Sequence, residues 1–185
     1  NLHGIPKLDD ANFAGTAKSN MCTLILTEGD SAKAFAIAGI SALKNGRDIF
    51  GVFPLKGKLL NVRDAGLKKI QGNAEIQNLI KIIGLQRYQT GTNKPKVYEG
   101  TKELRYGHVM VLTDQDVDGS HIKGLVFNFF HNFWPSLTKI DGFLQSIATP
   151  IVKAFKKKGK KIETFYTLTE FESWKEKVDI GGWDI

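Results

Sequence analysis

Three short apolar runs, each followed by a polar stretch that contains glycine, most constrain how this chain can fold. They are Thr23–Thr27, Ile49–Phe53 and His108–Thr113. Apolar runs of this length without polar alternation are typical of parallel strands that are buried on both faces. Helical patterns follow the first run, at Ala32–Leu43, and the third, where an apolar stripe runs from Ile122 to Phe133. Strands that alternate with helices predict an α/β fold, with a mostly parallel, doubly wound central sheet flanked by helices.

The ends of the expected helices can be read from capping residues. Asp30 or Ser31 is placed to cap the first helix and Ser120 the one that follows the third strand. Between them, Asn73 can begin a further helix that Gly84 ends.

Beyond Pro135 the pattern predicts a small β-rich extension. We expect strands near Phe143–Val152 and Ile162–Leu168, a lysine-rich hairpin loop between them, a short helix at Glu170–Lys177 and no element at the C-terminal end. The predicted organisation is a lead-in segment (residues 1–21), a core domain (residues 22–145) and a C-terminal extension (residues 146–185).

Composition bounds the partner and the kind of site. The 185 residues carry a formal net charge of +7, which favours a polyanionic partner. The sequence has no apolar run long enough to span a membrane and no signal-peptide pattern. One cysteine and four histidines exclude a zinc site built from cysteine and histidine. Both ends look cut, because Asn1 is not an initiator methionine, so we expect a piece of a longer protein.

Carboxylates gather where two of the predicted strands end. Glu28 follows the first strand, and Asp114, Asp116 and Asp118 follow the third. The carboxyl ends of parallel strands meet at one edge of a sheet, where loops turn into helices. Carboxylates crowded there repel one another unless a cation lies between them, and hard oxygen ligands suit Mg²⁺. The sequence therefore predicts a magnesium site, although the acidic run can equally be a turn-rich loop that caps the helix at Ser120, with Asp118 as a cap or an accessory residue.

Two known ligand-binding motifs, the EF-hand and the P-loop, are excluded by single residues. An EF-hand calcium loop that begins at Asp114 needs glutamate at its twelfth position, where this chain has Leu125. A P-loop at residues 51–58 needs serine or threonine after its lysine, where this chain has Leu59.

Three motifs follow one another along the chain. They are Glu28-Gly29-Asp30-Ser31-Ala32, Pro54-Leu55-Lys56-Gly57-Lys58-Leu59-Leu60-Asn61-Val62 and Thr113-Asp114-Gln115-Asp116-Val117-Asp118-Gly119-Ser120-His121-Ile122-Lys123-Gly124-Leu125. In this order they resemble the Toprim domain of type II DNA topoisomerases, and the eukaryotic enzymes in particular. The resemblance covers nearly the whole chain and implies the Toprim (Rossmann-like) fold.

The resemblance implies roles for the matched residues. It makes Glu28, Asp114 and Asp116 the catalytic ligands of one or two Mg²⁺ ions. It makes Lys58 and Asn61 contacts to DNA beside the scissile phosphate. Lys56 stands where the family often has arginine, which keeps the charge but loses the bidentate fork. Lys56 and Arg63 are the further DNA-binding positions, and the accessory positions are Asp118, Lys123 and His121, the last of which can equally be a structural histidine.

The chemistry implied by the resemblance is reversible cleavage and religation of double-stranded DNA by phosphoryl transfer to a tyrosine. The family's tyrosine lies in a separate winged-helix domain, so the nucleophile is absent from this chain. The Arg105-Tyr106 pair imitates the family's nucleophile motif, but the family has a non-catalytic pair at this place. The family's ATP-binding domain is also missing, so we expect the chain alone to be inactive. The resemblance further implies a nuclear isomerase that is a homodimer at full length.

Two other functions stay open at this point. One is a different metal-dependent Toprim enzyme, a primase or a nuclease, that works without a tyrosine. The other is a non-catalytic DNA-binding module that relies on two clusters of basic residues. One cluster is Lys56, Lys58, Arg63, Lys68 and Lys69, and the other is Lys153, Lys156, Lys157, Lys158, Lys160 and Lys161.

Overall fold

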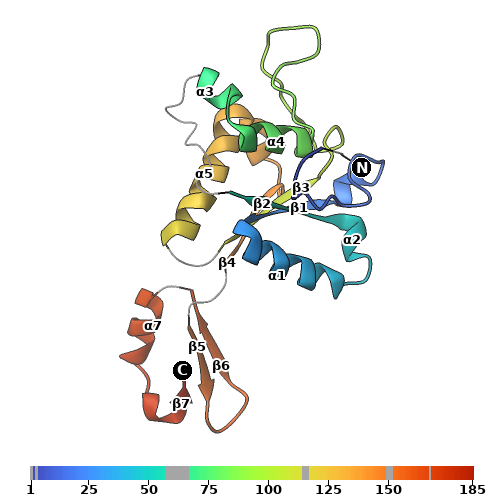
Figure 1. Cartoon of the computed structure of the whole chain (residues 1–185). Helices are drawn as coiled ribbons and strands as arrows, with labels where there is room; N and C mark the ends of the chain where they lie inside the picture. The colour runs from blue at the N-terminus through green and yellow to red at the C-terminus, as the bar shows by residue number, and fades with distance from the viewer. Residues whose placement is uncertain (1, 3, 57–66, 114–116, 149–151, 167) are drawn as a thin grey trace.

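The computed structural model describes residues 2, 4–56, 67–113, 117–148, 152–166 and 168–185 (Figure 1). Its main sheet has four strands in the order β2-β1-β3-β4, and every neighbouring pair is parallel. The strands are β1 (Thr23–Glu28), β2 (Phe50–Leu55), β3 (His108–Thr113) and β4 (Leu144–Ala148). The predicted parallel α/β sheet is confirmed.

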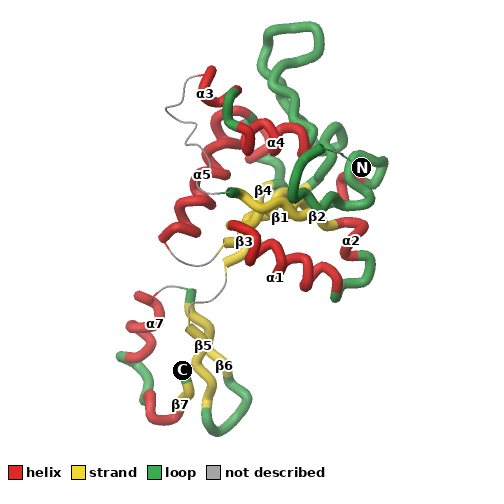
Figure 2. The backbone as a smooth tube through the Cα atoms, in the orientation of Figure 1, coloured by secondary structure: helices red, strands yellow, loops and turns green. Residues whose placement is uncertain are grey.

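Helices cover both faces of this sheet (Figures 1 and 2). On one face α1 (Gly29–Ser41) packs on β1 and β2, where Ala36 and Ile40 meet Ile25 and Val52. On the other face α4 (Ala74–Ile83) and α5 (Val117–Phe133) share the larger core with Leu24 and the other inward-facing strand residues. Alternate residues of each strand therefore supply the two cores, as a strand with period two requires.

Three shorter helices and two 3-10 turns lie before, between or after these elements in the described part of the chain. Helix α2 precedes β2, α3 precedes α4, and α6 follows α5. They are η1 (Ser19–Met21), α2 (Gly46–Ile49), α3 (Leu67–Gln71), α6 (Pro135–Thr138) and η3 (Ile180–Gly182).

The predicted caps of α4 are confirmed. The Asn73 side chain accepts a hydrogen bond from the Ile76 backbone N–H at 3.0 Å, and Gly84 ends the helix with φ of 76°. A left-handed glycine at this place satisfies the last carbonyl groups of the helix.

The predicted caps of the other two long helices are wrong. Helix α1 begins at Gly29, whose φ of 73° turns the chain from strand to helix within one residue. Asp30 and Ser31 therefore lie inside the first turn, and the cap position falls on Glu28, which makes no side-chain cap hydrogen bond. Helix α5 begins at Val117, so Ser120 lies within it.

A second, antiparallel sheet follows the main one, in the order β6-β5-β7. Its strands are β5 (Val152–Lys156), β6 (Ile162–Phe165) and β7 (Trp183–Asp184), and α7 (Leu168–Lys175) packs on it. The single strand predicted at 143–152 is wrong, because its first half joins β3 as β4 and its end begins β5. The predicted bare C-terminus is also wrong, because Trp183 pairs with Lys156 and its ring is buried.

The lead-in segment is tied to the main sheet. Asp9 and Val52 form an antiparallel bridge, with Val52 N donating to Asp9 O at 2.7 Å and Asp9 N to Val52 O at 2.9 Å. Ala11 and Ala14 belong to the larger core. In the part of the chain that is described, no helix combines the length and the apolar character needed to cross a membrane.

Candidate metal and DNA site

Three neighbouring strands end at the same edge of the sheet and carry the three sequence motifs. Strand β1 ends at Glu28, which lies opposite Leu55 at the end of β2. On its other side Thr27 lies opposite Leu112, one residue before the end of β3. Strand β3, which precedes the acidic run in the sequence, therefore ends on one side of β1, and β2, which precedes the lysine-bearing loop, ends on the other side.

This edge is also where the strand order reverses. After β1 the chain passes to β2 on one side, and later returns to β3 on the other side of β1. In open parallel sheets the crevice at such a point, outside the carboxyl ends, is the usual place for a ligand. The geometry thus supports the sequence argument that brought Glu28 and the acidic run together.

Glu28 is half-buried at the N-terminus of α1. Among the residues that the structure describes, no three aspartate, glutamate, histidine or cysteine side chains group as metal ligands. Several predicted site residues lie outside the described residues or have side chains that are not described: Lys58, Asn61, Arg63, Asp114, Asp116 and Asp118.

Two of the predicted accessory residues lie on the first turns of α5. His121 and Lys123 are both exposed, and the Lys123 Nζ atom lies 5.9 Å from the centre of the Phe127 ring. Their roles at the site stay predictions.

Lys56 is held by a residue that the sequence analysis did not identify. Its backbone N–H donates to a carboxylate oxygen of Glu75, in the first turn of α4. Burial raises the pKa of Glu75, while the hydrogen bond from Lys56 and the charge of Lys56 act in the opposite direction. Glu75 therefore fixes the chain where β2 ends and the lysine-bearing loop begins. Its position two residues after the Asn73 cap was visible in the sequence, but the contact with Lys56 is tertiary.

Asp30 belongs to a different set of contacts. Its carboxylate pairs with Lys7 of the lead-in segment at 2.5 Å, and the hydrogen bond from Lys7 lowers the pKa of Asp30. Nearby, Lys33 pairs with Asp9 and donates to the Lys7 carbonyl oxygen at 2.7 Å. The Asp30 side chain thus links α1 to the lead-in segment.

Tyr106 lies in a buried network of hydrogen bonds with the lead-in segment. Its side chain is fully buried, and its hydroxyl donates to Asp10 at 2.5 Å and accepts from the Ala11 backbone N–H at 2.9 Å. Arg105 holds the other carboxylate oxygen of Asp10 at 2.5 Å. Burial, followed by the hydrogen bond to Asp10, raises the pKa of Tyr106 well above its ordinary value of 10.0. A phenol that resists ionisation and has no exposure is a poor nucleophile.

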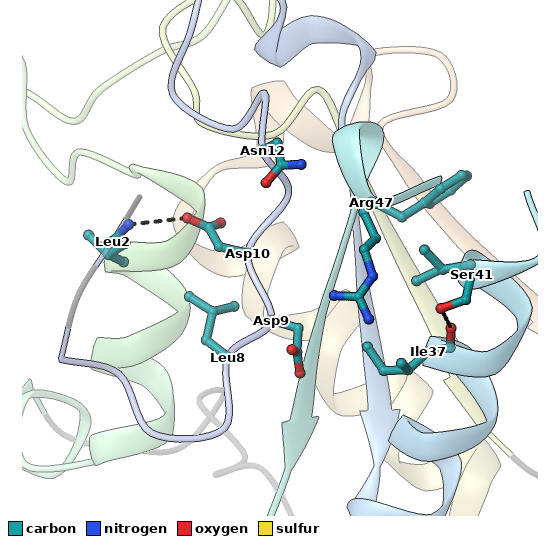
Figure 3. A pocket seen from close by; sticks show the side chains of 10 residues that line it. Leu2, Leu8, Asp9, Asp10, Asn12, Ile37, Ser41 and Arg47 are labelled. Carbon is teal, nitrogen blue, oxygen red and sulfur yellow. Dashed lines mark hydrogen bonds between the residues drawn. The ribbon is translucent and has the colours of Figure 1, made fainter. Parts of the chain in front are cut away.

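A cavity of about 270 Å³ lies at the other end of the main sheet (Figure 3). Phe50, the first residue of β2, lines it together with Leu8 and Asp9 of the lead-in segment and Ile37 of α1. Figure 3 shows the Arg47 side chain extending along this cavity. Since Phe50 and Leu55 are opposite ends of β2, the cavity is separate from the carboxyl edge.

A family model for the Toprim domain matches residues 23–163. The chain belongs to the Toprim family. The match begins at the first residue of β1 and runs through the main sheet into the second one. The resemblance read from the three motifs is thereby confirmed.

Named relatives narrow this Toprim assignment to type II DNA topoisomerases. The chain is 56% identical over 182 residues to DNA topoisomerase 2 of Plasmodium falciparum. That match covers 98% of this chain and 12% of the relative. It is 58% identical over 181 residues to the probable DNA topoisomerase 2 of Dictyostelium discoideum, again with 98% of this chain covered. The chain therefore spans roughly a tenth of the length of the relatives that it matches.

A solved structure agrees in fold. The crystal structure of the Plasmodium falciparum topoisomerase II DNA-binding, cleavage and re-ligation domain matches with a TM-score of 0.82 and 54% identity. The match covers 100% of this chain and 24% of that chain. The Toprim chain thus corresponds to one segment of that larger domain.

Proposed function

We propose that this chain is the metal-binding and DNA-binding Toprim segment of an ATP-dependent type II DNA topoisomerase, an isomerase that cleaves and religates double-stranded DNA. The observation that carries the proposal is that the three adjacent parallel strands that lead into the three sequence motifs end at the same edge of the sheet. The relatives reported above are named DNA topoisomerase 2, which favours this activity over a primase, a nuclease or a purely binding module.

The proposed metal ligands are Glu28, Asp114 and Asp116. A set of carboxylate oxygens fits a hard dication, and Mg²⁺ commonly binds with one or two such ligands beside its waters. Bound there, Mg²⁺ would stabilise the charge that develops on the phosphate and on the leaving oxygen. The half-buried Glu28 suits this role because its charge is only partly screened by water.

The proposed DNA contacts are Lys56, Lys58, Asn61 and Arg63, in the loop that leaves β2 beside Glu28. Cations next to a metal site hold the phosphate backbone in register with the reacting group. Lys56 is exposed, and the contact between its N–H and Glu75 fixes its backbone at the edge of the sheet. We assign Asp118, His121 and Lys123, at the start of α5, supporting roles.

The proposal places the remaining machinery outside this segment. The tyrosine that attacks DNA, the ATP-binding domain and the homodimer contacts would belong to other domains of a nuclear enzyme. The burial and hydrogen bonding of Tyr106 support this division, because they leave its hydroxyl unavailable.

DNA cleavage by the full-length enzyme that carries this segment tests the proposal. We expect Glu28→Gln to lower the rate of Mg²⁺-dependent strand cleavage roughly 100-fold, which is the order expected when one group that stabilises the transition state is lost. Asp30→Asn is the matched control, because Asp30 pairs with Lys7 and is not a proposed ligand. An unchanged cleavage rate in Glu28→Gln would contradict the proposed metal site.

A further inference from the structure

The antiparallel strands β5 and β6 form a hairpin, here called the lysine hairpin (residues 152–165), in which positive charge is concentrated. It holds six of the 26 lysines and arginines of the chain, although it is only 14 residues long. All six are exposed, and they are Lys153, Lys156, Lys157, Lys158, Lys160 and Lys161.

Most of this charge is not neutralised by the protein. The Lys161 Nζ atom pairs with a carboxylate oxygen of Glu163 at 2.8 Å, and the Lys157 Nζ atom lies 3.7 Å from a carboxylate oxygen of Asp184. In the described part of the chain, the other four lysines form no ion pair. Lysines that share a turn repel one another, so an excess of this kind favours an anionic partner.

The protein holds the hairpin in a defined place. The Lys156 N–H donates to the Lys161 carbonyl oxygen at 3.0 Å, and the Lys157 N–H donates to the Gly182 carbonyl oxygen at 2.9 Å. The Lys156 Nζ atom also lies 6.0 Å from the centre of the Trp183 ring. These contacts fix the base of the turn against β7.

An aromatic cluster supports the same hairpin from one face. The centre of the Trp174 ring on α7 lies 5.0 Å from the centre of the Phe165 ring of β6 and 5.1 Å from the centre of the Trp183 ring of β7. Ordering long side chains on a ligand costs less when the backbone that carries them is already fixed.

The main-sheet strand that precedes the hairpin in the sequence, β4, ends at the carboxyl edge of the main sheet. Strand β4 is parallel to β3, so its last residue, Ala148, lies at the same edge as the end of β3. Figure 1 shows the second sheet beyond this edge, on the side opposite the N-terminus.

We propose that the turn of the lysine hairpin is a second contact to the phosphate backbone of duplex DNA, separate from the metal site. It rests on the proposed function insofar as the ligand is DNA. Residues 156–161 contain no apolar side chain, which suits a polyanion better than a protein groove. Ammonium groups are point charges without a fixed fork, so the contact would be independent of base sequence.

Binding of the 185-residue chain to a labelled duplex, measured by fluorescence anisotropy over a range of salt concentrations, tests this contact. Affinity falls as salt rises, and each neutralised phosphate adds about 0.9 to the steepness of log K against log salt. The double variant Lys158→Gln with Lys160→Gln is therefore expected to make this salt dependence shallower by about 2 units of slope. Both side chains are exposed and without an ion pair among the described residues, so folding should be retained.

The matched control is Lys94→Gln with Lys102→Gln, which removes the same charge from exposed positions in the loop between α4 and β3. It should leave the slope near that of the wild type. Equal slopes for the two double variants, or no change in the hairpin variant, would overturn the proposal.

A third variant separates this proposal from the proposed function. Lys58→Ala is expected to make the salt dependence shallower by about 1 unit of slope, since it removes one phosphate contact beside the metal site. A response to Lys58→Ala but not to the hairpin variant would overturn the hairpin contact alone. If the wild-type chain did not bind duplex DNA at all, the proposed DNA-binding function and the hairpin contact would both fail.

Discussion

Tyr106 and Asp10 illustrate how single residues join distant parts of this chain. Asp10 lies in the lead-in segment, and its two carboxylate oxygens are shared between Tyr106 and Arg105, which stand directly before β3. The Arg105 guanidinium also donates to the Ile82 carbonyl oxygen of α4 at 2.8 Å. One buried carboxylate thus connects the lead-in segment to β3 and α4. The neighbourhood is tight, because a Cβ atom at Gly51 would collide with the Tyr106 hydroxyl.

Replacing Tyr106 by phenylalanine tests this connection. The variant removes a hydroxyl that pairs with both Asp10 and the Ala11 N–H, and leaves that buried N–H without its acceptor. We expect the free energy of unfolding to fall by about 1–3 kcal/mol, as measured by urea denaturation.

Tyr88→Phe is the control, because Tyr88 is 48% exposed. A loss in Tyr106→Phe as small as that in Tyr88→Phe would show that the buried network contributes little to stability.

At the scale of elements, the link between β2 and α4 depends on pH through Glu75. Glu75 has a raised pKa, so the folded chain holds its proton more tightly than the unfolded chain does. Its contribution to stability is therefore full below the ordinary value of 4.5 and is lost as pH rises through the raised value in the folded state.

Glu75→Gln removes this titration while keeping an oxygen that can accept the Lys56 N–H. We expect the stability of the variant relative to the wild type to increase between about pH 4 and pH 7, as measured by urea unfolding at each pH. Glu99→Gln, at an exposed carboxylate, controls for the loss of one negative charge. A stability difference that does not change with pH would contradict the raised pKa of Glu75.

The sequence predicted the elements whose signals are local. Strands β1 and β3 and the caps of α4 follow from short apolar runs, from Asn73 and from Gly84. The apolar stripe at helical spacing follows from the same kind of signal: five of its residues are buried and Phe133 is partly buried. The buried residues are Ile122, Leu125, Val126, Phe129 and Phe130.

The features that were missed depend on tertiary contacts. Strand β7 is two residues long and exists because Trp183 pairs with Lys156 and packs on Trp174. No local pattern distinguishes such a pair of residues from a loose end. The start of α1 was misplaced because serine and aspartate suggest a cap, whereas the left-handed Gly29 lets the helix begin earlier.

The candidate site shows the same division. The position of Glu28 at the carboxyl edge could be predicted, since it follows from strand direction alone. The contact between Glu75 and Lys56 could not, because it joins residues 19 positions apart through the packing of α4.

At the scale of the whole molecule, the two ends of the main sheet have different contents. One end carries Glu28 and the ends of the strands that precede the motifs, while the other carries the cavity beside Phe50 and the lead-in segment. A strand of six residues is about 17 Å long, so a metal bound at one edge lies much closer to one end of each strand than to the other.

Paramagnetic broadening by Mn²⁺, a dication that also prefers oxygen ligands, tests the central claim most directly. In NMR spectra of the 185-residue chain, substoichiometric Mn²⁺ should broaden the amide signals of Gly29 and Leu55 before those of Leu24 and Gly51, which lie on the same strands toward the other end. Glu28→Gln should remove this preference, and Asp30→Asn should keep it. Broadening that is equal at both ends in the wild type, or that is unchanged in Glu28→Gln, would contradict a metal site at the carboxyl edge.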